Sequence, residues 1–138
     1  MKIVLDTNVI VSGLLTPFGP GGEIVRMVSA GILIVQYDSR ILSEYYEVLH
    51  RPKFQFDVDE IESFLDFVQK NGRLITAVPL MNRLPDPDDE PFLEIAISGH
   101  ADCIITGNKA HFPKRLCQGT KALSPSQFID FYRPQTSK

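Results

Sequence analysis

The sequence predicts an α/β fold in which parallel strands alternate with helices. Short runs rich in Ile, Val and Leu recur along the chain, and the segments between them have the apolar periodicity of helices. This alternation is typical of strands that lie side by side in one parallel sheet. We expect the strands at residues 3–5, 33–36, 74–78, 103–106 and 121–123.

Residues that favour helix ends lie between the expected strands. Asp38 or Ser39 can begin a helix that ends near Leu49, because Arg51-Pro52 disfavours helical backbone. Further helices are expected at residues 57–72, at 91–98 and from Ser124-Pro125 onward.

The length of 138 residues fits one domain, and neither a repeat nor a low-complexity linker divides it. We therefore expect a single domain over residues 1–133 and a frayed tail over 134–138. The segment Gly19-Pro20-Gly21-Gly22 lacks the lysine and the spacing of a phosphate-binding loop. It is predicted to be a flexible turn before a helix at Glu23.

The composition excludes several classes of protein. Hydrophobic residues make up 43% of the chain and charged residues 22%, as in soluble globular domains. The apolar runs are much shorter than the roughly 20 residues of a membrane-spanning helix, and Asp6 interrupts any signal-peptide core. Two cysteines, Cys103 and Cys117, cannot form a disulfide framework. We therefore expect a cytoplasmic protein that does not contact a membrane.

The net charge of −3 lacks the basic excess of a protein that holds duplex nucleic acid by phosphate contacts alone. Divalent cations bound to clustered carboxylates would add positive charge that this number does not count. The net charge therefore does not exclude nucleic acid as a partner.

Polar side chains follow two of the expected strands. Asp6-Thr7-Asn8 comes directly after the first strand, and Thr106-Gly107-Asn108 ends the fourth. In parallel sheets, ligands bind outside the carboxyl ends of the strands. These triplets are therefore candidate site residues, although both also fit ordinary turns.

The segment from Asp86 to Glu90 holds four acids at the start of the helix expected at 91–98. Asp89 shares a helix face with the apolar residues of that helix, so we expect its side chain to point inward. We expect Glu90 to be solvated, whereas Asp86 and Asp88 fit either position. A buried carboxylate costs free energy unless it is paired or binds a metal, so this run is the strongest indication of a site.

Glu44 borders the apolar face of the helix expected at 39–49, a position that is more often occupied by surface residues. With Asp6 and the acidic run, it offers carboxylates from three separate parts of the chain. Oxygen ligands of this kind suit Mg²⁺ or Mn²⁺. Two such ions can activate a water and stabilise the leaving oxygen in phosphodiester hydrolysis, so this set favours a nuclease.

Four segments in this order resemble the PIN domain family, specifically the bacterial and archaeal PIN-family toxins of toxin–antitoxin systems. The segments are IVLDTNVIVSGLL, ILSEYYEVLHRPKF, LPDPDDEPFLEIAISGHADCIITGN and LSPSQFIDF, and the resemblance covers residues 1–132. It implies a three-layer α/β/α sandwich around a parallel sheet of four to five strands in the order 3-2-1-4-5. It also implies a Mg²⁺-dependent endoribonuclease, a small antitoxin protein as partner, and a homodimer.

Position by position, the resemblance implies that Asp6, Glu44 and Asp89 bind one Mg²⁺ or Mn²⁺. Water activated by the metal would then cleave single-stranded RNA and leave a 5'-phosphate and a 3'-hydroxyl. The alignment of the acidic run can shift by one residue, and the nearby acids would then substitute: Asp86, Asp88 and Glu90.

The sequence departs from the family pattern at Asn108, where many members have an aspartate. An amide can ligate through its carbonyl oxygen but brings no charge, so a second metal should bind more weakly. Asn8 and Thr106 would help to orient ligands or water.

Single-stranded RNA is usually held by basic residues and stacking aromatic rings. Two clusters fit this description, although solvated loop charge fits each equally well: Arg51 and Lys53 beside Phe54, and Lys109, His111, Lys114 and Arg115 beside Phe112.

Two alternatives differ from a nuclease. A haloacid-dehalogenase-like phosphatase also has an aspartate after its first strand, but its usual second aspartate would stand at Asn8. A PIN-fold module that binds RNA or protein with weak or no catalysis is favoured by Asn108. Retention of Asp6, Glu44 and Asp89 argues against such a module, because a scaffold gains little from converging acids.

Overall fold

A five-stranded parallel sheet with the order β3-β2-β1-β4-β5 forms the centre of the protein. The computed structural model describes the backbone of residues 1–136 and the side chains of residues 1–133. The strands are β1 (Lys2–Leu5), β2 (Ile34–Tyr37), β3 (Arg73–Leu74), β4 (Cys103–Ile105) and β5 (Ala122–Leu123). The predicted α/β class and the strand order implied by the resemblance are both confirmed.

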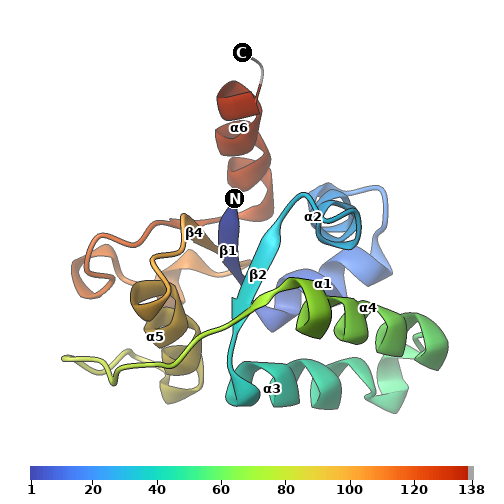
Figure 1. The fold of residues 1–138 in the computed structure, drawn as a ribbon, viewed down its shortest axis with the longest axis horizontal. Coiled ribbons are helices and arrows are strands. Elements are labelled where there is room, and N and C mark those ends of the chain that lie inside the picture. The colour runs from blue at the N-terminus through green and yellow to red at the C-terminus, as the bar shows by residue number, and fades with distance from the viewer. Residues whose placement is uncertain (137–138) are drawn as a thin grey trace.

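Helices cover both faces of this sheet. They are α1 (Thr7–Leu15), α2 (Pro20–Ser29), α3 (Ser39–Leu49), α4 (Val58–Asn71), α5 (Glu90–Ser98) and α6 (Pro125–Thr136). Figure 1 shows α5 on one side of the sheet, where it contacts β1, β2 and β4, and α1, α2 and α4 on the other. The predicted three-layer sandwich is therefore present.

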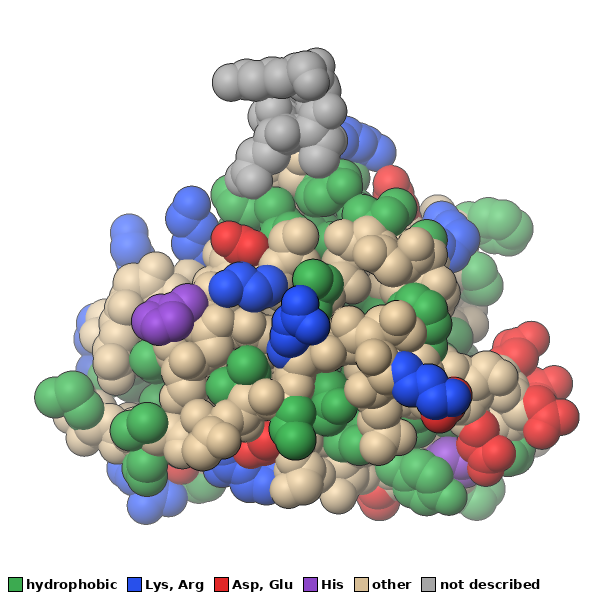
Figure 2. All heavy atoms as spheres, viewed as in Figure 1, with side chains coloured by type: hydrophobic (Ala, Val, Ile, Leu, Met, Phe, Trp, Pro, Cys, Tyr) green, Lys and Arg blue, Asp and Glu red, His purple; other side chains and the backbone are tan. Residues whose placement is uncertain are grey.

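The central strands are apolar on both faces because helices cover both. Ile3, Val4 and Leu5 of β1 are fully buried, as are Ile104 and Ile105 of β4. The helix α4, in contrast, has one face exposed to solvent, and that face is polar. The exposed face of α4 carries Asp59, Glu60, Glu62 and Asp66, and Figure 2 shows acidic side chains gathered at the edge of the molecule where α4 begins.

The segment that connects β1 to β2 is helical where turns were expected. Residues 7–15 form α1, which the sequence did not predict, and α2 begins at Pro20 inside the segment predicted to be a flexible turn. The two helices pack closely because glycines lie at their contact. A Cβ added to Gly13 of α1 would lie 2.6 Å from the Gly21 carbonyl oxygen of α2, and one added to Gly22 would lie 2.0 Å from the carbonyl oxygen of Pro17 in the connection between the two helices. Packing, rather than chain flexibility, therefore explains these glycines.

The edge strand β3 is shorter than predicted. Only Arg73 and Leu74 pair with β2, and the bond from the Ile75 N–H to the Tyr37 carbonyl is the last before the chain leaves the sheet. Residues 75–86 then run past α5 (Figure 1).

At the other end of the chain, α6 continues to Thr136, beyond the start of the expected tail. Residues 137–138 of that tail lie outside the described residues. Within residues 1–136, no helix combines the length and the apolar character needed to cross a membrane.

Candidate metal centre

Asp6 lies where β1 ends and α1 begins. Its backbone N–H donates to the Ile105 carbonyl at 2.9 Å, and its Oδ1 caps α1 by accepting from the Asn8 N–H at 3.3 Å. Its Oδ2 accepts from the hydroxyl of buried Thr106 at 2.7 Å. Parallel pairing of β1 and β4 brings these residues together, because Asp6 and Thr106 follow paired strand ends. The Asp6 side chain therefore has a fixed position at the carboxyl edge of the sheet.

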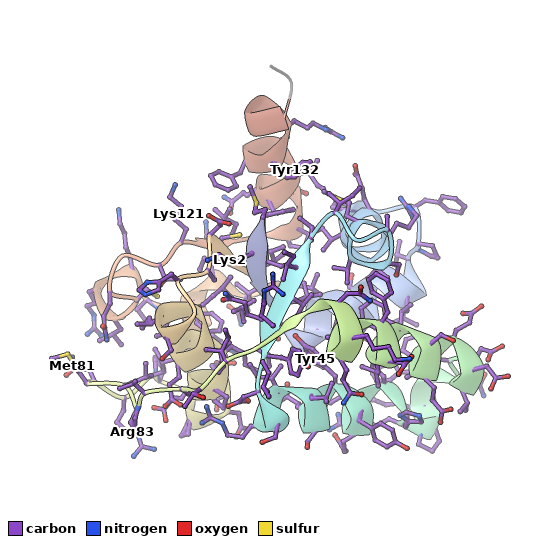
Figure 3. All side chains as sticks on the ribbon, viewed as in Figure 1. Lys2, Tyr45, Met81, Arg83, Lys121 and Tyr132 are labelled. Carbon is purple, nitrogen blue, oxygen red and sulfur yellow. The ribbon has the colours of Figure 1, made fainter. Side chains whose placement is uncertain are left out.

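Glu44 reaches this edge from α3. Its Oε2 accepts a hydrogen bond from the Thr7 hydroxyl, and the next residue, Tyr45, donates its hydroxyl to the Leu5 carbonyl. Tyr45 is fully buried between α3 and the sheet (Figure 3). Burial raises the pKa of Glu44, the Thr7 hydrogen bond lowers it, and the charges of Asp6 and Asp88 raise it further. Glu44 is therefore half-buried beside Asp6, instead of being a free surface residue.

Asp89 ends the short 3₁₀ turn Pro87–Asp89 and precedes α5. It is 9% exposed, so the predicted inward direction is confirmed. Burial raises its pKa from 3.8 to about 6, His111 opposes this rise, and the charges of Asp6, Asp86 and Glu44 add to it. Carboxylates from β1, α3 and the start of α5 thus act on one another in one partly buried region.

Glu90 was predicted to be solvated, but this prediction is wrong. Its Oε2 accepts from the Leu84 backbone N–H at 2.9 Å and from the Arg83 Nε at 3.1 Å. These contacts attach the end of the 75–86 segment to α5. Arg83 itself lies near the outer end of this segment, beside Met81 (Figure 3). The Glu90 carboxylate is thus engaged in holding the loop.

Asp86 and Asp88 lie on the same turn. Asp86 accepts from the Asp88 N–H at 2.9 Å, which caps the turn, and it is half-buried. Asp88 is exposed, although its charge acts on Glu44. Both acids therefore border the region that contains Asp6, Glu44 and Asp89.

Asn108 and Asn8 are exposed residues at the same edge of the sheet. The Asn108 N–H donates to the Thr106 hydroxyl at 3.1 Å, so Thr106 links the backbone of Asn108 to the carboxylate of Asp6. Asn108 is a neutral amide, so its side chain adds no negative charge to this border of the site.

His111 joins the site from the 3₁₀ turn Lys109–His111, which follows β4. Its Nδ1 lies 2.9 Å from Asp89 Oδ2. From the sequence, His111 was expected only as a member of a basic cluster, and its contact with Asp89 was not predicted. One feature of the sequence could have indicated His111 as a site residue: it comes three residues after Asn108, on a loop that leaves the carboxyl edge of the sheet.

The two basic clusters lie at different places around the site. Arg51 forms an ion pair with Glu47 at 2.9 Å and lowers the pKa of Glu44, whereas Lys53 lies 5.0 Å from the centre of the Phe54 ring. In the second cluster, Phe112 is 3% exposed and cannot stack on a base as its predicted role requires. Arg115 is exposed on the turn Lys114–Leu116.

A hollow of about 580 Å³ lies beside the second cluster. Apolar residues line part of it, including Phe112, Ala122 and Leu123, and three lysines also line it: Lys109, Lys114 and Lys121. Lys121 was not part of the predicted cluster. Its Nζ lies 4.9 Å from the centre of the Phe131 ring.

A family model described as the PIN domain matches residues 2–110, which include all three of the acids that converge at the sheet edge. The chain belongs to the PIN domain family. PIN domains have a nuclease-type fold and are generally metal-dependent nucleases. The match ends one residue before His111.

Uncharacterized protein MJ1680 of Methanocaldococcus jannaschii is 29% identical to this PIN domain over 112 residues. The similarity covers 79% of this chain and 72% of the archaeal protein, whose name states no function.

The residues present fit a divalent cation. Asp89 Oδ2 is buried and accepts no hydrogen bond from the described residues, and a buried carboxylate oxygen of this kind is stabilised by a metal. Asp86, Asp89 and His111 can each place one ligand atom within 4.8 Å of the others. The donors are carboxylate oxygens with one imidazole nitrogen, a set that Mg²⁺ or Mn²⁺ can use in part or in full.

Proposed function

We propose that this PIN domain is a metal-dependent endoribonuclease that cleaves single-stranded RNA. The observation that supports this proposal is the convergence of Asp6, Glu44 and Asp89, of which two have a raised pKa. Burial is the larger cause of both raised pKa values and repulsion among the acids adds to it, and a bound cation relieves both effects because it stabilises the charged carboxylates. An enzyme that hydrolyses phosphodiesters uses such cations.

Asp6, Glu44 and Asp89 would hold Mg²⁺ or Mn²⁺. When bound, the ion supplies an activated water and neutralises charge on the scissile phosphate. The hydroxyl groups of Thr106 and Thr7 donate hydrogen bonds to the carboxylates of Asp6 and Glu44 and so hold them in place. Asn8 and Asn108 can orient a water, and the basic residues Arg51, Lys53, Lys109, Lys114 and Arg115 would contact the RNA backbone. The products carry a 5'-phosphate and a 3'-hydroxyl.

The physiological role we propose is that of the toxin of a toxin–antitoxin pair in the cytoplasm, as a homodimer with a small antitoxin as partner. This role rests on the resemblance of the four sequence segments to PIN-family toxins. Induced expression in a bacterial host should arrest growth for the wild type and leave growth normal for Asp6→Asn.

A second candidate function is binding of RNA or protein with weak or no catalysis. Asn108 favours it, because the amide removes one charge from the border of the site. Binding of RNA that persists in EDTA without cleavage would support this candidate.

Cleavage of end-labelled single-stranded RNA tests the two functions. The assay compares Mn²⁺, Mg²⁺ and EDTA for the wild type, Asp6→Asn, Asn108→Asp and a control, Asp66→Asn, which removes an exposed acid on α4. We expect metal-dependent cleavage by the wild type and the control, a loss of at least a hundredfold for Asp6→Asn, and a gain for Asn108→Asp. Full activity of Asp6→Asn would contradict the assigned site. Cleavage by Asn108→Asp alone would favour the binding module.

A further inference from the structure

A histidine lies against Asp89, one of the two buried acids of the centre. His111 Nδ1 is 2.9 Å from Asp89 Oδ2, and the His111 side chain is 43% exposed, so the ring forms the outer wall of the site. Asp89 is 9% exposed, and its Oδ2 accepts no hydrogen bond from the described residues despite this short distance. The two atoms are therefore close without an aligned N–H···O bond between them.

The spacing of these atoms is that of two ligands of one metal ion. Ligands that bind at about 2.0–2.1 Å and at right angles lie roughly 2.8–3.0 Å apart. Asp86 provides a third atom, and all three lie within 4.8 Å of one another. Ligands on opposite sides of such an ion are about 4.1 Å apart, so three atoms within 4.8 Å of one another need only small side-chain movements to bind one ion.

The donor set differs from that of Asp6, Glu44 and Asp89 because it includes an imidazole. Mg²⁺ prefers oxygen ligands, whereas Mn²⁺ and the later first-row divalent ions also bind imidazole nitrogen. The loop that carries His111 begins at Asn108, directly after β4 and Thr106. His111 thus lies on a loop that leaves the same edge of the sheet as Asp6.

We propose that Asp86, Asp89 and His111 form a second metal position that binds a divalent transition ion such as Mn²⁺ in preference to Mg²⁺. This inference rests on the proposed function, since Asp89 would serve both positions, but it concerns metal identity and can be tested without RNA. It assigns ligand roles to His111, which lies outside the segment matched by the family model, and to Asp86.

Equilibrium binding of Mn²⁺ and of Mg²⁺ to the full chain, measured separately by titration calorimetry, provides the first test. We expect His111→Ala to weaken Mn²⁺ binding by tenfold or more and to change Mg²⁺ binding by less than about twofold. Asp86→Asn should weaken both. His100→Asn is the matched control, because His100 is exposed and Asn tolerates its positive φ of 51°.

Nitrogen NMR of the wild type provides a second test, which needs no substitution and therefore does not depend on whether a variant folds. The chain contains three histidines, so His50 and His100 are internal references. We expect Zn²⁺, used as a diamagnetic probe, to shift Nδ1 of His111 and to fix the proton on its Nε2. An Nδ1 signal that does not respond to Zn²⁺ would overturn the proposal.

Two further outcomes separate this inference from the proposed function. Equal losses of Mn²⁺ and Mg²⁺ binding in His111→Ala would show that His111 only positions Asp89, and would overturn the second position while RNA cleavage dependent on Asp6 remained. Selective loss of Mn²⁺ binding in a protein that cleaves no RNA would support the metal position and contradict the nuclease.

Discussion

Asp89 shows how one residue can reduce stability in exchange for a binding site. Its carboxylate lies in a partly buried region together with Asp6 and Glu44, and burial is the largest cause of its raised pKa. A group whose pKa is higher in the folded state than in the unfolded state stabilises the fold below its unfolded pKa and loses this contribution as the pH rises through its folded pKa. For Asp89 this loss occurs between about pH 4 and pH 6 and is complete at neutral pH.

We therefore predict that Asp89→Asn stabilises the metal-free protein at pH 7 to 8 by about 1 to 2 kcal/mol, because the amide is uncharged and similar in volume. The gain should shrink as the pH falls towards 4, where Asp89 is protonated in both states. Urea denaturation in EDTA at a series of pH values measures this. In Mn²⁺ the order should reverse, because only the wild type retains the carboxylate ligand.

Asp66→Asn is the control for this series, since it changes an exposed acid on α4 and should shift the stability little at any pH. A loss of stability for Asp89→Asn at pH 7 in EDTA would mean that the contact with His111 outweighs the cost of burial.

The site residues differed in how well the sequence could predict them. Asp6 and Asp89 were recognisable because strand ends and helix periodicity fix where their side chains point. His111 was not, since the loop after β4 has no periodicity that relates it to Asp89. The solvated position expected of Glu90 failed for a similar reason, because the 75–86 segment folds back and places the Leu84 N–H against its carboxylate.

At the scale of elements, the starts of α3 and α4 could be predicted from the sequence, because a capping aspartate forms hydrogen bonds with backbone N–H groups only two or three residues away. Asp38 accepts from the Arg40 and Ile41 N–H groups at the start of α3, and Asp57 caps α4 in the same way. The helix α1 also has an aspartate cap, Asp6, but its sequence TNVIVSGLL is rich in β-branched residues, so its helical form depends on packing against α2. Contacts between elements are not visible in a local pattern.

That packing leads to a prediction for Gly22, which is buried at the start of α2. Gly22→Ala would place a Cβ 2.0 Å from the Pro17 carbonyl oxygen, so the backbone of the α1–α2 connection must move. We expect a loss of about 2 kcal/mol or more in the free energy of unfolding, measured by chemical denaturation. Gly107→Ala is the matched control, because nothing lies within 4 Å of its added Cβ. Similar stabilities of the two variants would contradict the close approach of the Pro17 backbone to Gly22.

At the scale of the whole molecule, charge of opposite sign lies on different elements. The exposed face of α4 is acidic, whereas Lys109, Lys114 and Lys121 line the hollow beside β5 and the loop that carries His111. A chain with a net charge of −3 can therefore still attract a phosphate backbone over one part of its surface. The hollow lies next to the metal centre along the chain, since Lys109 follows Asn108.

We predict that the paired substitution Lys114→Gln and Lys121→Gln weakens binding of single-stranded RNA about three- to tenfold at low salt, because each lysine releases counterions from a phosphate on binding. Binding is measured in the cleavage-deficient Asp6→Asn background by fluorescence anisotropy at several salt concentrations. The slope of the logarithm of affinity against the logarithm of salt should fall by roughly 0.7 for each contact that is lost.

The control for this pair is Lys70→Gln, which removes a lysine that pairs with Asp66 on α4 at 2.9 Å. It should leave both the affinity and the salt slope unchanged, because the surrounding acids of α4 repel phosphate. If Lys70→Gln weakened binding as much as the pair, RNA would be held by general surface charge, and the hollow would have no special part in it. If only the pair acted, the strand would pass from this hollow over the His111 loop to the carboxylates at the sheet edge.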